Sequence, residues 1–164
     1  MPFDDVDEVA YWTEAAEQGD ADAQYILGFM YASVNDVPYN ANEAVKWYEK
    51  AADQGFVYAQ ILVANMYELG DGIEHDIQKA VEWYSRAANQ GSTAAQYRLG
   101  SHYARGQGVE KNLEEAYLWW CLAASKGHQL AKTGKTELTQ SIPVSAMITI
   151  EIRARCWRPI QTMN

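Results

Sequence analysis

The residues of this chain that could bind a metal or act as nucleophiles are three histidines and two cysteines. His75, His102 and His128 are scattered, and no Cys or His stands at the short spacing that a zinc site requires. His75 and His102 fall in or beside expected turns, so we expect both to be solvated. Cys121 and Cys156 are too few for a disulfide framework, and we expect reduced thiols. The sequence therefore predicts no metal site.

Catalytic arrangements are equally hard to find. The carboxylates form no pair that stands apart from helix surfaces and caps, and nothing singles out a Ser–His–acid arrangement, which is left open. Glycine-rich segments lie at 70–72 (GDG) and 106–108 (GQG), but neither follows a strand, which argues against phosphate-binding loops. We therefore predict no catalytic residues, no cofactor and no enzyme activity.

The elements that must position the side chains are four copies of one pattern. The segment VKWYEKAADQG (45–55) returns as VEWYSRAANQG (81–91), a step of 36 residues. The same step relates alanine pairs, glycines, single alanines, tyrosines and aromatic pairs, without insertion or deletion. These positions are Ala15-Ala16, Ala51-Ala52, Ala87-Ala88 and Ala123-Ala124; Gly19, Gly55, Gly91 and Gly127; Ala23, Ala59, Ala95 and Ala131; Tyr31, Tyr67 and Tyr103; Tyr11-Trp12, Trp47-Tyr48, Trp83-Tyr84 and Trp119-Trp120. Such self-similarity indicates a solenoid.

Each period contains two amphipathic helices. The apolar residues of the second copy follow helical spacing in two stripes: Ala44, Trp47, Tyr48, Ala51 and Ala52, then Ala59, Leu62, Val63, Met66 and Tyr67. Trp47, Trp83 and Trp119 lie at the edge of the first stripe and should pack between repeats, with Tyr48 and Tyr84 more deeply buried.

Caps and turns mark the ends of these helices. Asp4, Asn40, Asp76 and Asn112 share one repeat position and are interpreted as N-caps. Asn40 with Glu43, and Asn112 with Glu115, have capping-box spacing. Gly55 and its equivalents should end the first helix of each repeat in a left-handed conformation, and the GDG and GQG segments should form tight turns.

The pattern resembles the Sel-1-like repeat, a relative of the tetratricopeptide repeat. The third copy carries its motif as Ala95, Leu99-Gly100, Tyr103, Gly106, Gly108, Val109, Ala116, Trp119-Trp120, Ala123-Ala124 and Gly127. The resemblance covers about residues 8–131 and implies an all-α fold, a right-handed superhelical solenoid of about four helix–turn–helix repeats. The resemblance also implies that the chain is a scaffold for protein–protein interactions. It does not imply that the chain catalyses a reaction.

The solenoid should run over residues 1–141, with residues 142–164 forming a C-terminal cap and tail of the same domain. The segment ITIEIRA (148–154) alternates like a strand, but the neighbouring helices favour a capping helix over Ser145–Trp157. Cys121 replaces polar residues of the earlier copies and should face away from the core stripe.

Charge is distributed unevenly along this acidic chain, whose net charge is −9. Residues 1–45 hold ten acids and no Lys or Arg, whereas residues 125–164 hold six basic residues against two acids. An acidic chain without a basic stripe is a poor candidate for binding the phosphate backbone, so we expect no nucleic acid as a direct ligand. No apolar stretch is long enough for a membrane helix, and the first residues lack the basic start of a signal peptide, which predicts a cytoplasmic protein. The opposite charges of the two ends suggest weak head-to-tail self-association.

The second helix of each repeat has a face that the core does not need. In the tetratricopeptide fold this face lines a concave groove, so the resemblance implies the same role for Tyr25, Phe29, Tyr58, Ile61, Asn65, Tyr97, Ser101 and Arg105. Aromatic side chains aligned across repeats suit recognition of a peptide or helix. The favoured function is a non-catalytic adaptor or scaffold that binds a protein partner there.

Two other classes of function stay open. One is a dedicated inhibitor, such as an immunity or antitoxin protein that masks a basic effector, since the chain is small and its first third is acidic. The other is an enzyme. Some Sel-1-like relatives are linked to β-lactam chemistry, but they resemble cysteine-rich exported proteins, unlike this chain.

Overall fold

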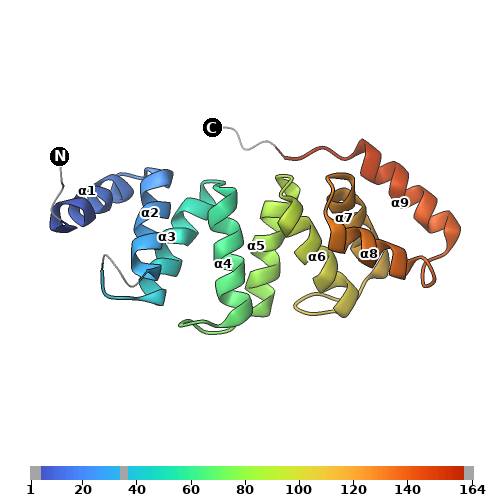
Figure 1. Cartoon of the computed structure of the whole chain (residues 1–164), viewed down its shortest axis with the longest axis horizontal. Helices are drawn as coiled ribbons and strands as arrows, with labels where there is room; N and C mark the ends of the chain where they lie inside the picture. Colours follow the sequence, from blue (N-terminus) through green and yellow to red (C-terminus); the bar gives the residue numbers. More distant parts are fainter. Residues whose placement is uncertain (1–4, 34–36, 161–164) are drawn as a thin grey trace. The chain divides into compact units, whose positions relative to one another are not determined.

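The computed structural model describes residues 5–33 and 37–160, and every regular element in that part of the chain is an α-helix (Figure 1). The helices are α1 (Asp5–Glu17), α2 (Ala21–Ala32), α3 (Ala41–Asp53), α4 (Val57–Leu69), α5 (Ile77–Asn89), α6 (Thr93–Arg105), α7 (Leu113–Ser125), α8 (Gln129–Leu138) and α9 (Val144–Cys156). The predicted all-α fold of helix–turn–helix repeats is confirmed.

The chain divides into two compact units, residues 1–76 and 77–164. In the first unit α1 packs on α2, α2 on α3 and α3 on α4. In the second unit α5 packs on α6, α6 on α7 and α7 on both α8 and α9. Helices thus contact their neighbours along the chain, as in repeat proteins. The single domain expected from the sequence stays a prediction.

The glycine turns and the asparagine caps are present as predicted, with one difference. Gly127 has φ +93° and Gly106 has φ +67°, left-handed values that suit glycine. Asn112 Oδ1 accepts the backbone N–H of Glu115 at 3.0 Å. The Asn112 N–H, however, donates to the Tyr103 carbonyl at 2.9 Å, so it is not the partner of the Glu115 carboxylate. The second bond of a capping box is thereby replaced by a bond to the preceding helix, α6.

Asn40 caps α3 in the same way, accepting the N–H of Glu43 at 3.2 Å, while its own N–H donates to the Tyr31 carbonyl at 2.9 Å. Asp76 directly precedes α5 and donates its N–H to the Tyr67 carbonyl at 3.0 Å. The remaining predicted cap, at position 4, lies outside the described residues.

The aromatic pairs of α3, α5 and α7 pack as predicted, whereas Tyr11 of α1 is 63% exposed. Tyr48 and Tyr84 are 3% and 0% exposed. Trp83 and Trp119 are also buried, and Trp47 is half-buried against the apolar cluster of α1 and α2. The tryptophan row therefore belongs to the packing between helices.

The predicted core stripe of α4 is partly wrong. Leu62, Met66 and Tyr67 are only half-buried, whereas the buried residues of this helix are Ala59, Gln60, Val63 and Ala64. The inward face is rotated because Gln60 points into the core, where its Nε2 donates to the Ala52 carbonyl at 2.9 Å. A helical wheel that counts glutamine as a surface residue misses this rotation.

Buried glutamine is a repeated feature that the sequence reasoning missed. Gln24 donates to the Ala16 carbonyl at 3.1 Å, and Gln96 donates to the Ala88 carbonyl at 3.2 Å. Each bond ties the second helix of a repeat to the end of the first. An alanine–glutamine pair recurring at 23–24, 59–60 and 95–96 was the available signal.

The C-terminal segment forms the predicted capping helix, α9. Ile142 and Ile150 are buried in one cluster with Tyr117, Leu118 and Cys121 of α7. Polar bonds hold α9 in place at its edges. Glu151 accepts from Tyr117 Oη at 3.0 Å and from Lys135 Nζ at 2.7 Å, and Arg153 pairs with Glu115 at 3.0 Å.

Candidate functional site

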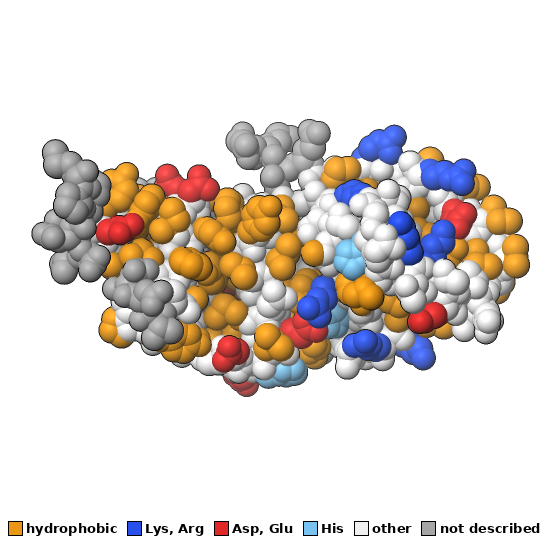
Figure 2. Space-filling model, viewed as in Figure 1, with side chains coloured by type: hydrophobic (Ala, Val, Ile, Leu, Met, Phe, Trp, Pro, Cys, Tyr) orange, Lys and Arg blue, Asp and Glu red, His pale blue; other side chains and the backbone are white. Residues whose placement is uncertain are grey.

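In the unit of residues 1–76, the predicted partner-binding residues lie on α2 and α4. Phe29 and Tyr58 are 56% and 72% exposed, which is unusual for such large apolar side chains. Tyr25, Ile61 and Asn65 are half-buried. Figure 2 shows hydrophobic side chains gathered over the region of α2 to α4. This group has the composition of a protein-binding surface.

Tilted ring contacts order this aromatic group. The Tyr25 ring lies 5.0 Å from the ring of Phe56 and 5.6 Å from that of Tyr48, and the rings of Phe56 and Tyr58 are 6.3 Å apart. Phe56 precedes α4 and was not among the predicted site residues. These contacts fix the rings of Tyr25 and Phe56 in position, whereas the Tyr58 ring stays exposed.

In the unit of residues 77–164, the other predicted residues surround a hollow of about 300 Å³ between α6 and α8. Its lining includes Tyr97, Ser101 and Arg105, together with Trp120 and Leu130. Ser101 Oγ donates to the Tyr97 carbonyl at 3.0 Å, and Trp120 Nε1 donates to the same carbonyl at 3.1 Å. The three predicted side chains are thus brought together in one place.

The His128 ring packs against one face of the Tyr97 ring, and the sequence analysis did not predict this contact. The two rings are stacked, with centroids 4.5 Å apart and planes at 23°. His128 Nδ1 also accepts the N–H of Ala131 at 3.2 Å, so the imidazole caps α8. Tyr25 and Phe56 also lie 31 positions apart and also contact each other, but their rings are tilted by 47°.

The prediction that His102 is solvated is wrong. It is 3% exposed, its Nδ1 lies 3.1 Å from the Gln107 carbonyl oxygen, and its ring lies 5.5 Å from that of Tyr84. The side chain points back under the GQG turn and packs on the core, because its bond to that turn satisfies one ring nitrogen. His75 is exposed, as expected.

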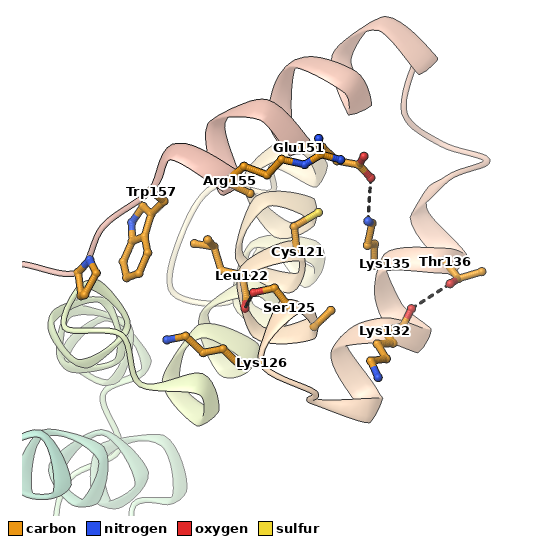
Figure 3. Close-up of a pocket in the computed structure, with 13 residues that line it drawn as sticks. Cys121, Leu122, Ser125, Lys126, Lys132, Lys135, Thr136, Glu151, Arg155 and Trp157 are labelled. Atoms are coloured by element: carbon orange, nitrogen blue, oxygen red, sulfur yellow. Dashed lines mark hydrogen bonds and ion pairs between the residues drawn. The ribbon is translucent and has the colours of Figure 1, made fainter.

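A second hollow, of about 800 Å³, opens between α7, α8 and α9, and sequence reasoning did not predict it (Figure 3). Its cations come from three places: Lys126 follows α7, Lys132 and Lys135 belong to α8, and Arg155 belongs to α9. Leu122, Trp157 and Pro159 supply apolar lining, and Glu151 is its carboxylate. We call this hollow the basic pocket.

One ion pair orders the basic pocket. Lys135 Nζ lies 2.7 Å from Glu151, and this bond, with that from Tyr117, holds the pKa of the Glu151 carboxyl below its ordinary value. Burial works against the charged form of Lys135, but the bond to Glu151 and neighbouring groups raise its pKa overall. Lys135 and Glu151 are therefore both charged at neutral pH. Lys126 is not part of this pair, and its Nζ donates to the Gly91 carbonyl at 2.6 Å.

Cys121 also lines the basic pocket. The sequence places it off the core stripe of its helix, yet the thiol is buried because α9 covers that side of α7. Burial raises the pKa of the Cys121 thiol, which keeps it protonated and a poor nucleophile. Both cysteines are free, as predicted.

The two thiols should differ sharply in reactivity. In the folded protein we expect iodoacetamide to alkylate exposed Cys156 at the rate of a free thiol, while buried Cys121 reacts at least tenfold more slowly. Mass spectrometry of tryptic peptides over a time course measures both rates. Addition of urea should equalise them. Equal rates without urea would contradict the covering of Cys121 by α9.

No group of three His, Cys, Asp or Glu side chains within residues 5–33 and 37–160 is arranged to hold a metal ion. In the same residues, no helix has the length and apolar composition needed to cross a bilayer.

Comparison with known proteins gives consistent results. The profile of the Sel1 repeat matches residues 9–20, 21–56, 57–92 and 93–128. A Sel1 repeat protein from Oxalobacter formigenes is 34% identical, with a TM-score of 0.70 over 79% of this chain and 98% of that chain. A protective antigen of uropathogenic Escherichia coli with an SLR fold is 25% identical, with a TM-score of 0.57 over 91% of this chain and 40% of its own. The cysteine rich protein B of Helicobacter pylori, 22% identical with a TM-score of 0.58 over 79% of this chain and 92% of its own, shares the fold. No protein with curated annotation matches the sequence.

Proposed function

The chain belongs to the Sel1 repeat family, and we propose that it acts as an adaptor that binds a peptide or helix of a partner protein. The proposed contact residues are the predicted ones: Tyr25, Phe29, Tyr58, Ile61 and Asn65 in the first unit, and Tyr97, Ser101 and Arg105 in the second. Sel1 repeat proteins are typically modules for protein–protein interaction, and the proposal places that general role on particular residues.

The observation that carries the proposal is the exposure of Phe29 and Tyr58 beside an ordered group of rings. Burying a large aromatic side chain at an interface contributes strongly to affinity, so residues of this kind are frequent hot spots. Tyr25 and Phe56 hold each other in place, which lowers the entropy that a partner's binding must overcome.

We further propose that the module is non-catalytic. Two groups in the basic pocket that could do chemistry are poorly suited to it: the Cys121 thiol is held protonated, and the low pKa of Glu151 makes it a poor proton donor at neutral pH. The inhibitor alternative and the cytoplasmic location stay predictions, because no particular contact favours either.

The double variant Phe29→Ala/Tyr58→Ala tests the adaptor proposal. Each substitution should change the free energy of unfolding by less than about 1 kcal/mol, since both side chains are mostly exposed. Partner binding should weaken by about 1–2 kcal/mol or more per residue. The measurement is quantitative mass spectrometry of proteins captured from the native cell by wild-type and variant chains, followed by calorimetric titration of the recovered partner.

Two variants serve as controls. Ile152→Ala removes an apolar side chain that is 57% exposed on α9, and it should leave capture unchanged. Leu27→Ala removes a fully buried side chain of α2 and should lower stability instead. Full capture by the double variant would show that this aromatic group is not the working surface.

A further inference from the structure

The lysines of the basic pocket occupy positions that hold other residues in the first three repeats. With a step of 36, Lys126 corresponds to glutamines, Lys132 to the buried glutamines, and Lys135 to buried aliphatic residues. The corresponding sets are Gln18, Gln54 and Gln90; Gln24, Gln60 and Gln96; Leu27, Val63 and Leu99. At these three positions the fourth repeat therefore departs from the pattern towards lysine.

The residues at these departures line the pocket. In the third repeat Gln96 and Leu99 are buried and fill the space between helices. In the fourth repeat the equivalent Lys132 and Lys135 line an open hollow that α9 covers only in part. An exposed apolar end needs a cap, but a cap alone does not require lysine at these positions.

The cations of the pocket outnumber its carboxylates by four to one. Lys135 pairs with Glu151, and Arg155 is close enough to help lower the pKa of the Glu151 carboxyl. Lys126 and Lys132 have no carboxylate within ion-pair distance among the described residues. Figure 2 shows Lys and Arg side chains concentrated over the region of α7 to α9. In a chain of net charge −9, this is a locally positive site.

We propose that the basic pocket binds an acidic segment of a partner protein. Its cations are spread over α8, α9 and the end of α7, which suits carboxylates spaced along an extended peptide better than one compact anion. Leu122, Trp157 and Pro159 lie among the cations and suit apolar side chains between the acidic ones. The inference rests on the proposed role in protein binding, but it uses another surface.

Helix α8 separates that surface from the hollow beside Tyr97. Leu130, Thr133, Gly134 and Glu137 line the hollow beside Tyr97, and Lys132, Lys135 and Thr136 line the basic pocket. At 100° per residue these two sets lie on roughly opposite sides of the helix. Substitutions in one site can therefore be made without touching the other.

The test titrates the full chain with a fluorescein-labelled peptide of alternating glutamate and leucine, followed by fluorescence anisotropy. The decisive variant is Lys126→Gln/Lys132→Gln, which removes two charges and restores the residues of the earlier repeats. Glutamine occurs at both positions in the earlier repeats. Gln54 donates to the Gly19 carbonyl at 2.9 Å, as Lys126 does to that of Gly91, and Gln96, the equivalent of Lys132, donates to the Ala88 carbonyl at 3.2 Å. We expect the Kd of the variant to rise about tenfold, and wild-type binding to weaken as salt is added.

Three comparisons complete the test. Lys46→Gln/Lys111→Gln removes two charges elsewhere and should leave the Kd within about twofold, as should Phe29→Ala. A peptide with glutamine in place of glutamate should not bind. The proposal is overturned if the peptide does not bind to the wild-type chain. It is also overturned if Lys46→Gln/Lys111→Gln raises the Kd as much as Lys126→Gln/Lys132→Gln does. Light scattering addresses a second copy as the occupant: dimers at low salt that dissociate in Lys126→Gln/Lys132→Gln, without binding of the peptide, would also overturn it.

Discussion

Replacement of Ile150 by alanine should lower the free energy of unfolding by about 2–5 kcal/mol. The side chain is 6% exposed and belongs to the cluster that α9 forms with Tyr117, Leu118 and Cys121. Alanine would leave a cavity there, and the surrounding side chains could not close it completely. Urea unfolding, followed by circular dichroism, measures the change.

Neighbouring isoleucines provide the matched controls. Ile148 and Ile152 are 56% and 57% exposed on the same helix, so alanine at either position should change stability by no more than about 0.5 kcal/mol. In a strand all three side chains would share one face and respond alike. Equal losses at positions 148, 150 and 152 would therefore contradict the helix, and deletion of residues 142–164 with an unchanged melting temperature would contradict its role as a cap.

The periodicity of the sequence was sufficient to predict the helices, their turns and the buried aromatic pairs. A step of 36 residues repeated without insertion requires equivalent backbone at equivalent positions, and few folds meet that condition. Tyr84 at 0% exposed and the left-handed glycines follow from this constraint alone. Such features are local or repeated, so a single sequence contains enough information to place them.

Features that depend on a polar group finding a buried partner were not predictable in the same way. Gln60 is buried because the Ala52 carbonyl accepts a hydrogen bond from its side chain. His102 is buried because its Nδ1 lies within hydrogen-bond distance of the Gln107 carbonyl. A pattern of apolar and polar residues cannot show where a free carbonyl will be. The rotation of α4, which left Leu62 half-buried, is a direct consequence.

The basic pocket was missed for a related reason. It depends on where α9 packs on α7, and contacts of a terminal helix do not follow the repeat. The three lysines were nevertheless visible as departures from the pattern at positions 126, 132 and 135. Departures from a strict repeat therefore deserve as much weight as the repeat itself when a site is sought.

Leu99→Ala should be about as destabilising as Ile150→Ala, with a loss of about 2–5 kcal/mol, because Leu99 is 1% exposed and sits at the centre of the packed face of α6. Leu62→Ala should cost less, about 1 kcal/mol, since that side chain is only half-buried on α4. A simple wheel places Leu62 in the core stripe and predicts equal losses, so the comparison tests the rotation of α4 directly. Urea unfolding of the two variants under one set of conditions is the measurement. If Leu62→Ala lowers the free energy of unfolding as much as Leu99→Ala, then the burial of Gln60 does not turn Leu62 outward. The core stripe that the sequence predicts for α4 would then be correct.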